Sequence, residues 1–148
     1  MSFKRSPGGN SADAPLDFKT CVQRVLELRE VPAGRDELAS IVPDEHDADA
    51  LVSHIENAIQ SPAFRAKVDA VQVQLTAASK PLLTLDEVKM LAAYTAEHPY
   101  PLYKWLNAWL MDNRRDAKVL HHVGPAFVLL FRALEKLPRR VTSAARGV

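Results

Sequence analysis

The chain has 148 residues, the length of one ordinary domain, of which 47% are hydrophobic and 25% charged. This composition is globular, so it excludes wholesale disorder and a collagen-like fibre. Nineteen basic and 18 acidic residues leave a formal net charge of +1, which argues against nucleic-acid binding by the whole surface.

Two further features concern disulfides and membranes. The single cysteine, Cys21, cannot form an internal disulfide. The longest apolar run, Ala126–Phe131, is far shorter than the roughly 20 residues of a membrane span. Residues 1–15 are rich in Ser, Gly, Pro and Asn and contain no apolar stretch of a secretory signal. We therefore expect a disordered N-terminal tail, a cytoplasmic protein and no membrane partner.

From Leu16 onward the apolar residues recur with a period close to 3.6, which predicts an all-α fold. The ten prolines and five glycines fall mostly between the periodic segments. The sequence predicts a bundle of about six or seven helices, followed by a short strand-like tail over 139–148. The predicted helices run over about 17–30, 35–41, 44–59, 62–80, 85–97, 101–111 and 117–137, of which the second is a short turn.

Three sequence signals mark helix starts. Asp17 is typical of an N-cap residue, and Ser61 precedes a proline at a first helical position. Thr84 followed three residues later by Glu87 is typical of a capping box.

Helical spacing also predicts which side chains are buried. Phe127 and Phe131 are four residues apart, so both are expected in the core. The dipeptide Gly124-Pro125 is expected to kink the last helix or to split it in two. In the predicted helix over 85–97, the side chains expected to face the core are Leu85, Val88, Leu91, Ala92 and Thr95. In the predicted helix over 117–137, the apolar side chains are Val119, Leu120, Val123, Phe127, Val128, Phe131 and Leu134.

No catalytic or metal-binding motif stands out. His46 lies in an acidic helix start, and His121 and His122 are adjacent, so neither case has the spacing of metal ligands on one helix face. Cys21 lies on an apolar stripe, where a thiol behaves as a small hydrophobe. The sequence contains neither a Gly-x-Ser-x-Gly elbow nor a Gly-rich phosphate loop. We therefore expect no catalytic residue and no metal site.

Two surface features leave alternatives open. Residues 114–148 carry eight basic and two acidic residues, a balance of +6, which fits either an anion-binding face or a solvated helix end. Trp105 and Trp109 share a helix face near Tyr94, Tyr100 and Tyr103. This aromatic cluster favours core packing with an edge for a protein partner over a platform for stacking bases.

One ordered set of motifs resembles a known family. The motifs are Leu83-Thr84-Leu85-Asp86-Glu87, Ala93-Tyr94-Thr95, Tyr103-x-x-Leu106-Asn107-x-x-Leu110, Ala133-Leu134-Glu135-Lys136-Leu137-Pro138 and Thr142-x-x-x-Arg146-Gly147-Val148. Their order and spacing resemble the N-terminal helical lobe of arginine-type mono-ADP-ribosyltransferases. The resemblance covers about residues 82–148.

The resemblance implies a cofactor and a role for two residues. Arg146 matches the family arginine on the first core strand, which contacts NAD near its phosphates, and a guanidinium suits a pyrophosphate because it donates two parallel hydrogen bonds. Asn107 matches a family residue whose amide can satisfy backbone groups between helices, which is a structural role. Two positions depart from the family pattern, since Met111 replaces an arginine and Ala145 replaces an aromatic residue.

These observations support a function without catalysis by this chain alone. The 148 residues contain no Ser-Thr-Ser strand and no Glu-x-Glu loop, which carries the catalytic glutamate in the family. We expect residues 16–80 to form an accessory helical bundle, and residues 81–148 to form a helical lobe of an ADP-ribosyltransferase-like protein. The alternative is a non-enzymatic helical module that binds another protein, and a weaker one is a nucleic-acid binder using the basic C-terminal third.

Overall fold

The fold is all-α over the residues that the structure describes. In the computed structural model these are residues 16–28, 32, 38, 47–97, 101–112 and 116–138, and they contain helices and no strand. The expected tails over 1–15 and 139–148 lie outside this set, as does nearly all of the short turn expected over 35–41.

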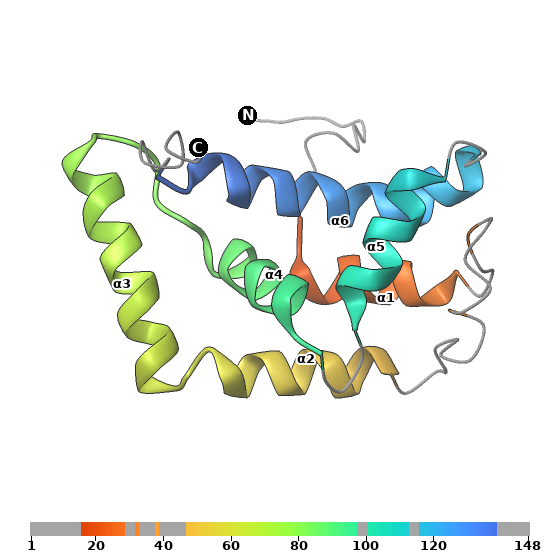
Figure 1. Cartoon of the computed structure of the whole chain (residues 1–148), viewed down its shortest axis with the longest axis horizontal. Helices are drawn as coiled ribbons and strands as arrows, with labels where there is room; N and C mark the ends of the chain where they lie inside the picture. Colours follow the sequence, from red (N-terminus) through yellow and green to blue (C-terminus); the bar gives the residue numbers. More distant parts are fainter. Residues whose placement is uncertain are drawn as a thin grey trace, which may run out of the picture.

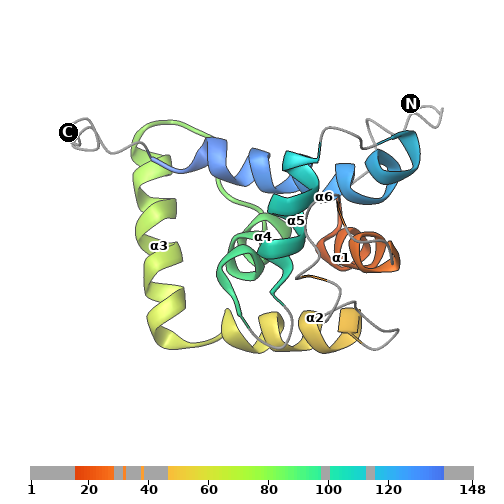
Figure 2. The ribbon, with the colours of Figure 1, turned by 45° about the vertical axis from the view of Figure 1, so that its right-hand side comes forward.

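Six helices make up the described part of the chain (Figure 1). They are α1 (Phe18–Glu27), α2 (Asp47–Ala58), α3 (Pro62–Ala77), α4 (Leu85–Thr95), α5 (Leu102–Met111) and α6 (Ala117–Lys136). α1 and α4 form a middle layer, with α6 packed on one side and α2 on the other, and α5 packs against α4 and α6. α3 stands at one edge of the molecule (Figure 2).

The predicted N-caps are confirmed. The side chain of Asp17 accepts hydrogen bonds from the hydroxyl of Thr20 at 2.7 Å and from the backbone N–H of Thr20 at 3.1 Å. The hydroxyl bond, followed by the backbone bond, lowers the pKa of Asp17. Ser61 accepts from the N–H of Phe64, with Pro62 at the first helical position. Asp86 of α4 adds a tertiary cap, because its carboxylate accepts from the N–H of Phe18 at 2.9 Å.

The core lies where α1, α2, α4 and α6 meet. Its fully enclosed side chains include Val22, Leu51, Met90 and Val123, one from each of these helices. α1 therefore shares one hydrophobic core with α4 and α6, although α1 belongs to the expected accessory bundle and the other two to the expected lobe.

Several expected core positions are wrong. Phe131 is 45% exposed, while Phe127, one turn earlier, is buried. Leu85 and Thr95 of α4, which were expected inward, also lie exposed, as do the apolar side chains of Leu120, Val128 and Leu134 in α6. The reason is that α6 carries apolar residues on two faces, and only one of them can point toward α1 and α4.

Of the two outcomes expected at Gly124-Pro125, a kink or a split of the last helix, the split does not occur. α6 is one helix of 20 residues with Pro125 inside it. Proline removes one backbone hydrogen bond, at a cost of about 3 kcal/mol in a helix interior. The neighbouring Val123 and Ala126 are fully buried, so tertiary packing holds the helix together across the proline.

Candidate functional site

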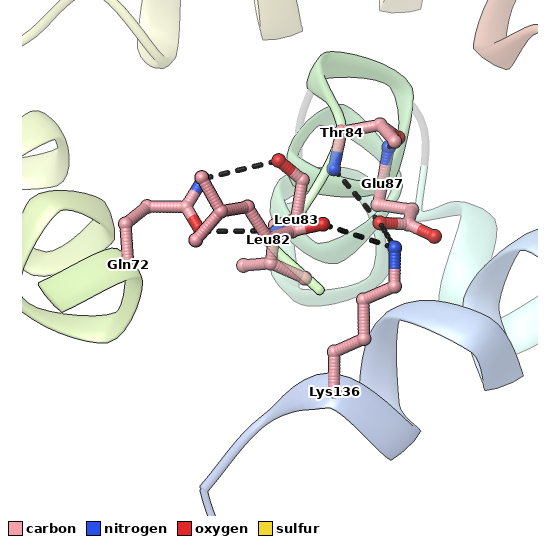
Figure 3. Close-up of polar contacts among 6 residues, drawn as sticks. All are labelled: Gln72, Leu82, Leu83, Thr84, Glu87 and Lys136. Atoms are coloured by element: carbon pink, nitrogen blue, oxygen red, sulfur yellow. Dashed lines mark hydrogen bonds and ion pairs between the residues drawn. The ribbon is translucent and has the colours of Figure 1, made fainter. Parts of the chain in front are cut away.

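The most connected polar site surrounds the first turn of α4 (Figure 3). The N–H of Glu87 donates to the Thr84 hydroxyl at 3.1 Å, and the N–H of Thr84 donates to the Glu87 carboxylate at 2.8 Å. This is the capping box that the sequence predicts.

The same carboxylate forms a buried ion pair. Glu87 is only 4% exposed, and its Oε1 atom accepts from the Lys136 ammonium at 2.7 Å. Lys136 also donates to the carbonyl of Leu82 at 3.0 Å. The pair therefore holds the end of α6 against the start of α4, and it compensates the cost of burying a carboxylate.

A third element joins this site through Gln72 of α3. Its side-chain amide donates to the carbonyl of Leu83 and accepts from the N–H of Leu83, both at 3.0 Å. The amide thus satisfies both backbone groups of a residue that lies outside any helix (Figure 3).

A second polar cluster connects α4 with α5. The hydroxyl of Tyr94 donates to the amide oxygen of Asn107 at 2.5 Å. The rings of Tyr94 and Tyr103 are arranged edge-to-face, with their centroids 6.5 Å apart. The hydroxyl of Tyr103 donates to Glu97 at 2.6 Å, and this hydrogen bond raises the pKa of Tyr103. Asn107 therefore joins α5 to α4 through a side-chain hydroxyl, whereas the expected role of its amide was to satisfy backbone groups between helices.

The thiol of Cys21 is unsuited to nucleophilic catalysis. It is 1% exposed, and burial raises its pKa from the ordinary value of 9.0 to about 11. At neutral pH the side chain is therefore a neutral thiol inside the core.

The adjacent histidines contact α1. Nε2 of His121 lies 2.8 Å from the guanidinium of Arg24, and Nε2 of His122 lies 3.6 Å from the carboxylate of Glu27. No group of three or more potential metal ligands occurs among the described residues, and His46 lies outside them.

The aromatic cluster is mostly internal. Trp105 and Trp109 are 1% and 3% exposed, so neither offers a face on which a nucleic-acid base could stack. This favours the core-packing interpretation. Tyr100 lies outside the described residues.

The outer face of α6 is apolar and exposed. Phe131 stacks on Phe127 with ring centroids 6.0 Å apart. The exposed side chains of this α6 outer face are Leu120, Val128, Phe131 and Leu134. Among the described helices, α6 is the one long and apolar enough to cross a membrane, a test that the core helix of a bundle also passes.

The expected NAD contact, Arg146, lies outside the described residues, as do Ala145 and several basic residues of the 114–148 segment. Sequence reasoning missed the ion pair of Glu87 with Lys136 and the contact of Gln72 with Leu83. Glu87 was recognised only as a local cap. A basic residue in the last turn of α6 was visible, but nothing in the spacing pairs it with a residue 49 positions away.

Comparison of the chain with protein-family models, with curated proteins and with solved structures found no match.

Proposed function

We propose that residues 82–148 form the helical lobe of an ADP-ribosyltransferase-like protein, and that this chain does not catalyse transfer by itself. The proposal rests on the ordered motifs of the sequence. One structural observation supports it: residues from different motifs make specific tertiary contacts with each other.

These contacts join four of the motifs in two pairs. Glu87 of the Leu-Thr-x-x-Glu motif pairs with Lys136 of the Ala-Leu-x-Lys-Leu-Pro motif at 2.7 Å. Tyr94 of the Tyr-Thr motif binds Asn107 of the Asn-x-x-Leu motif. Contacts of this kind are what the parts of a single helical lobe would make.

A chemical reason supports the part of the proposal that this chain does not catalyse transfer by itself. The buried carboxylate of Glu87 is already bound to Lys136 and to the N–H of Thr84, so it is not available to a sugar. The full sequence contains no Glu-x-Glu motif. An oxocarbenium-like transition state needs a carboxylate next to the sugar, and in the family the Glu-x-Glu motif carries that carboxylate.

NAD titration followed by amide NMR tests the proposal. We expect NAD at millimolar concentration to shift amide signals at the end of α6, because Arg146 follows that helix in sequence. Arg146→Ala should abolish the shifts, whereas the control Arg132→Ala, on the exposed side of α6, should retain them. No nicotinamide should be released.

Two outcomes would count against the proposal. Identical NAD responses of the wild type and Arg146→Ala, or no response at all, would remove the cofactor assignment. Release of nicotinamide by the chain alone would show that it is catalytically competent.

The α6 outer face favours a second candidate, a non-enzymatic module that binds another protein. A row of exposed apolar side chains on one helix is a common means of docking. Under this alternative Phe131→Glu should abolish partner binding in its native cells, while the control Val73→Glu, at a 67% exposed position of α3, should not. Binding would also be independent of NAD.

A further inference from the structure

α3 is the helix least integrated into the bundle. Leu75 is its one buried residue, and the extensive helix–helix contacts of the described chain all lie among the other five helices. Both ribbon views show α3 standing apart at the edge (Figures 1 and 2). The side chain of Gln72, bound to Leu83, fixes α3 to the segment that leads into α4 (Figure 3).

The space between α3 and α4 contains an apolar pocket of about 200 Å³. Its polar lining residues are Lys67 and Thr95, and the Thr95 hydroxyl already donates to the carbonyl of Ala92. Its principal apolar lining residues are Phe64, Val68, Val71, Val88, Leu91 and Leu137. The pocket is therefore an apolar site with a single cationic side chain.

A second, more polar opening of about 390 Å³ adjoins this pocket. The two share Val68, Leu83 and Val88, and the second adds Arg65 and Asp69. We call the two openings together the α3–α4 trough. One half of the trough is apolar and the other is polar, so its chemistry changes along its length.

The charges at the trough favour an anion. Arg65 and Lys67 are both exposed, and neither forms an ion pair with another described residue. Asp69 is the one acidic residue lining either opening, so the three charges sum to +1.

From this distribution we propose that the α3–α4 trough binds a single-chain amphiphile with an anionic head, such as a medium-chain carboxylate. The alkyl chain occupies the apolar half, and the carboxylate lies at the rim of that half beside Lys67, because Arg65 lines the other opening together with Asp69. A pocket of about 200 Å³ has room for roughly six or seven groups the size of a water molecule, which suits an alkyl segment of about that many carbons. The site uses neither Arg146 nor NAD, so this proposal stands or falls separately from the proposed function.

Calorimetric titration with hexanoate, octanoate, decanoate and decyltrimethylammonium below their micelle concentrations tests the proposal. Each additional buried methylene should tighten binding about fourfold until the pocket is full, so octanoate should bind roughly 15-fold more tightly than hexanoate, and decanoate should gain little over octanoate. The cationic amphiphile should bind more weakly than decanoate because Lys67 repels its head group.

Three variants locate the site. Val68→Trp fills the wall shared by both openings and should abolish binding. Lys67→Glu lies at an exposed position, so the protein should fold normally; decanoate should bind about tenfold more weakly, and the preference for the anionic amphiphile should reverse. Lys104→Glu, an exposed control on α5, should bind decanoate as the wild type does.

The proposal is overturned by any of three results. The first is the absence of saturable decanoate binding to the folded wild type. The second is decanoate binding that Lys67→Glu and Val68→Trp leave unchanged. The third is equal affinity of the wild type for the anionic and the cationic amphiphile.

Discussion

The ion pair between Glu87 and Lys136 gives a quantitative test of how the helices are held together. Lys136→Met retains most of the apolar stem but removes the ammonium that contacts a carboxylate with 4% exposure. Removing one partner of a fully buried pair costs about 3–5 kcal/mol. The Lys136 side chain is 22% exposed, so solvent screens the pair, and we expect a loss of about 2–3 kcal/mol.

A double-mutant cycle separates the pair from its surroundings. Glu87→Gln keeps an oxygen that can accept from the Thr84 N–H, so it should cost only about 1–2 kcal/mol. The double variant should be less destabilised than the sum of the two single variants, with a coupling energy of about 1–2 kcal/mol. Urea unfolding followed by circular dichroism, with unchanged m-values, measures each free energy.

The ion pair of Glu56 with Lys89 serves as the control. Its atoms lie 3.4 Å apart, and the Glu56 side chain is 53% exposed, so the same cycle should give less than about 0.5 kcal/mol. If the Glu87 cycle gave a coupling no larger than this control, the reasoning that burial strengthens the contact would be refuted.

Three further predictions concern the core and the α4–α5 contact. The pKa of Cys21 is raised to about 11 in the folded protein, so its thiol ionises at lower pH in the unfolded chain than in the folded one. The free energy of unfolding should therefore be unaffected by Cys21 ionisation below pH 9 and should fall by about 3 kcal/mol, relative to the Cys21→Ala variant, as the pH rises toward 11. Parallel pH curves of the two proteins would contradict this. In urea unfolding, Phe127→Ala should lower the free energy of unfolding by about 3–5 kcal/mol and Phe131→Ala by about 1 kcal/mol, because Phe127 is buried and Phe131 is exposed. Equal losses would place both rings in the core. Tyr94→Phe should lower the free energy of unfolding by about 1 kcal/mol in the same measurement. If the protein already carries Asn107→Ala, adding Tyr94→Phe should cause no further loss, which would confirm that the two side chains act as a pair.

The helix starts were predictable because each depends on neighbouring residues. A hydroxyl or carboxylate side chain at an N-cap binds an N–H two or three positions later, so the pattern is present in the sequence itself. Thr84 with Glu87, and Ser61 with Pro62, therefore mark helix starts correctly. The all-α fold follows in the same way from the helical period of the apolar residues.

The tertiary partners were not predictable from spacing. Glu87 meets Lys136 across 49 residues, and Phe18 meets Asp86 across 68. Such contacts depend on the angles at which helices pack, which local sequence does not determine. The candidate site is built mainly from contacts of this kind, so its capping box was visible in the sequence but its ion pair was not.

The orientation of a helix is hardest to predict when apolar residues surround it. In α4 the fully buried side chains include Met90 and Ala93, whereas the predicted inward face included the exposed Leu85. In α6 the helical pattern placed Phe131 with Phe127, although the bundle covers one of the two rings. The energy of burying either face of such a helix is similar, so the choice is made by the neighbours α1 and α4. An apolar face left over by that choice stays exposed, which is why the α6 outer face, and not the aromatic cluster around Trp105, is the surface that the alternative proposal assigns to a protein partner.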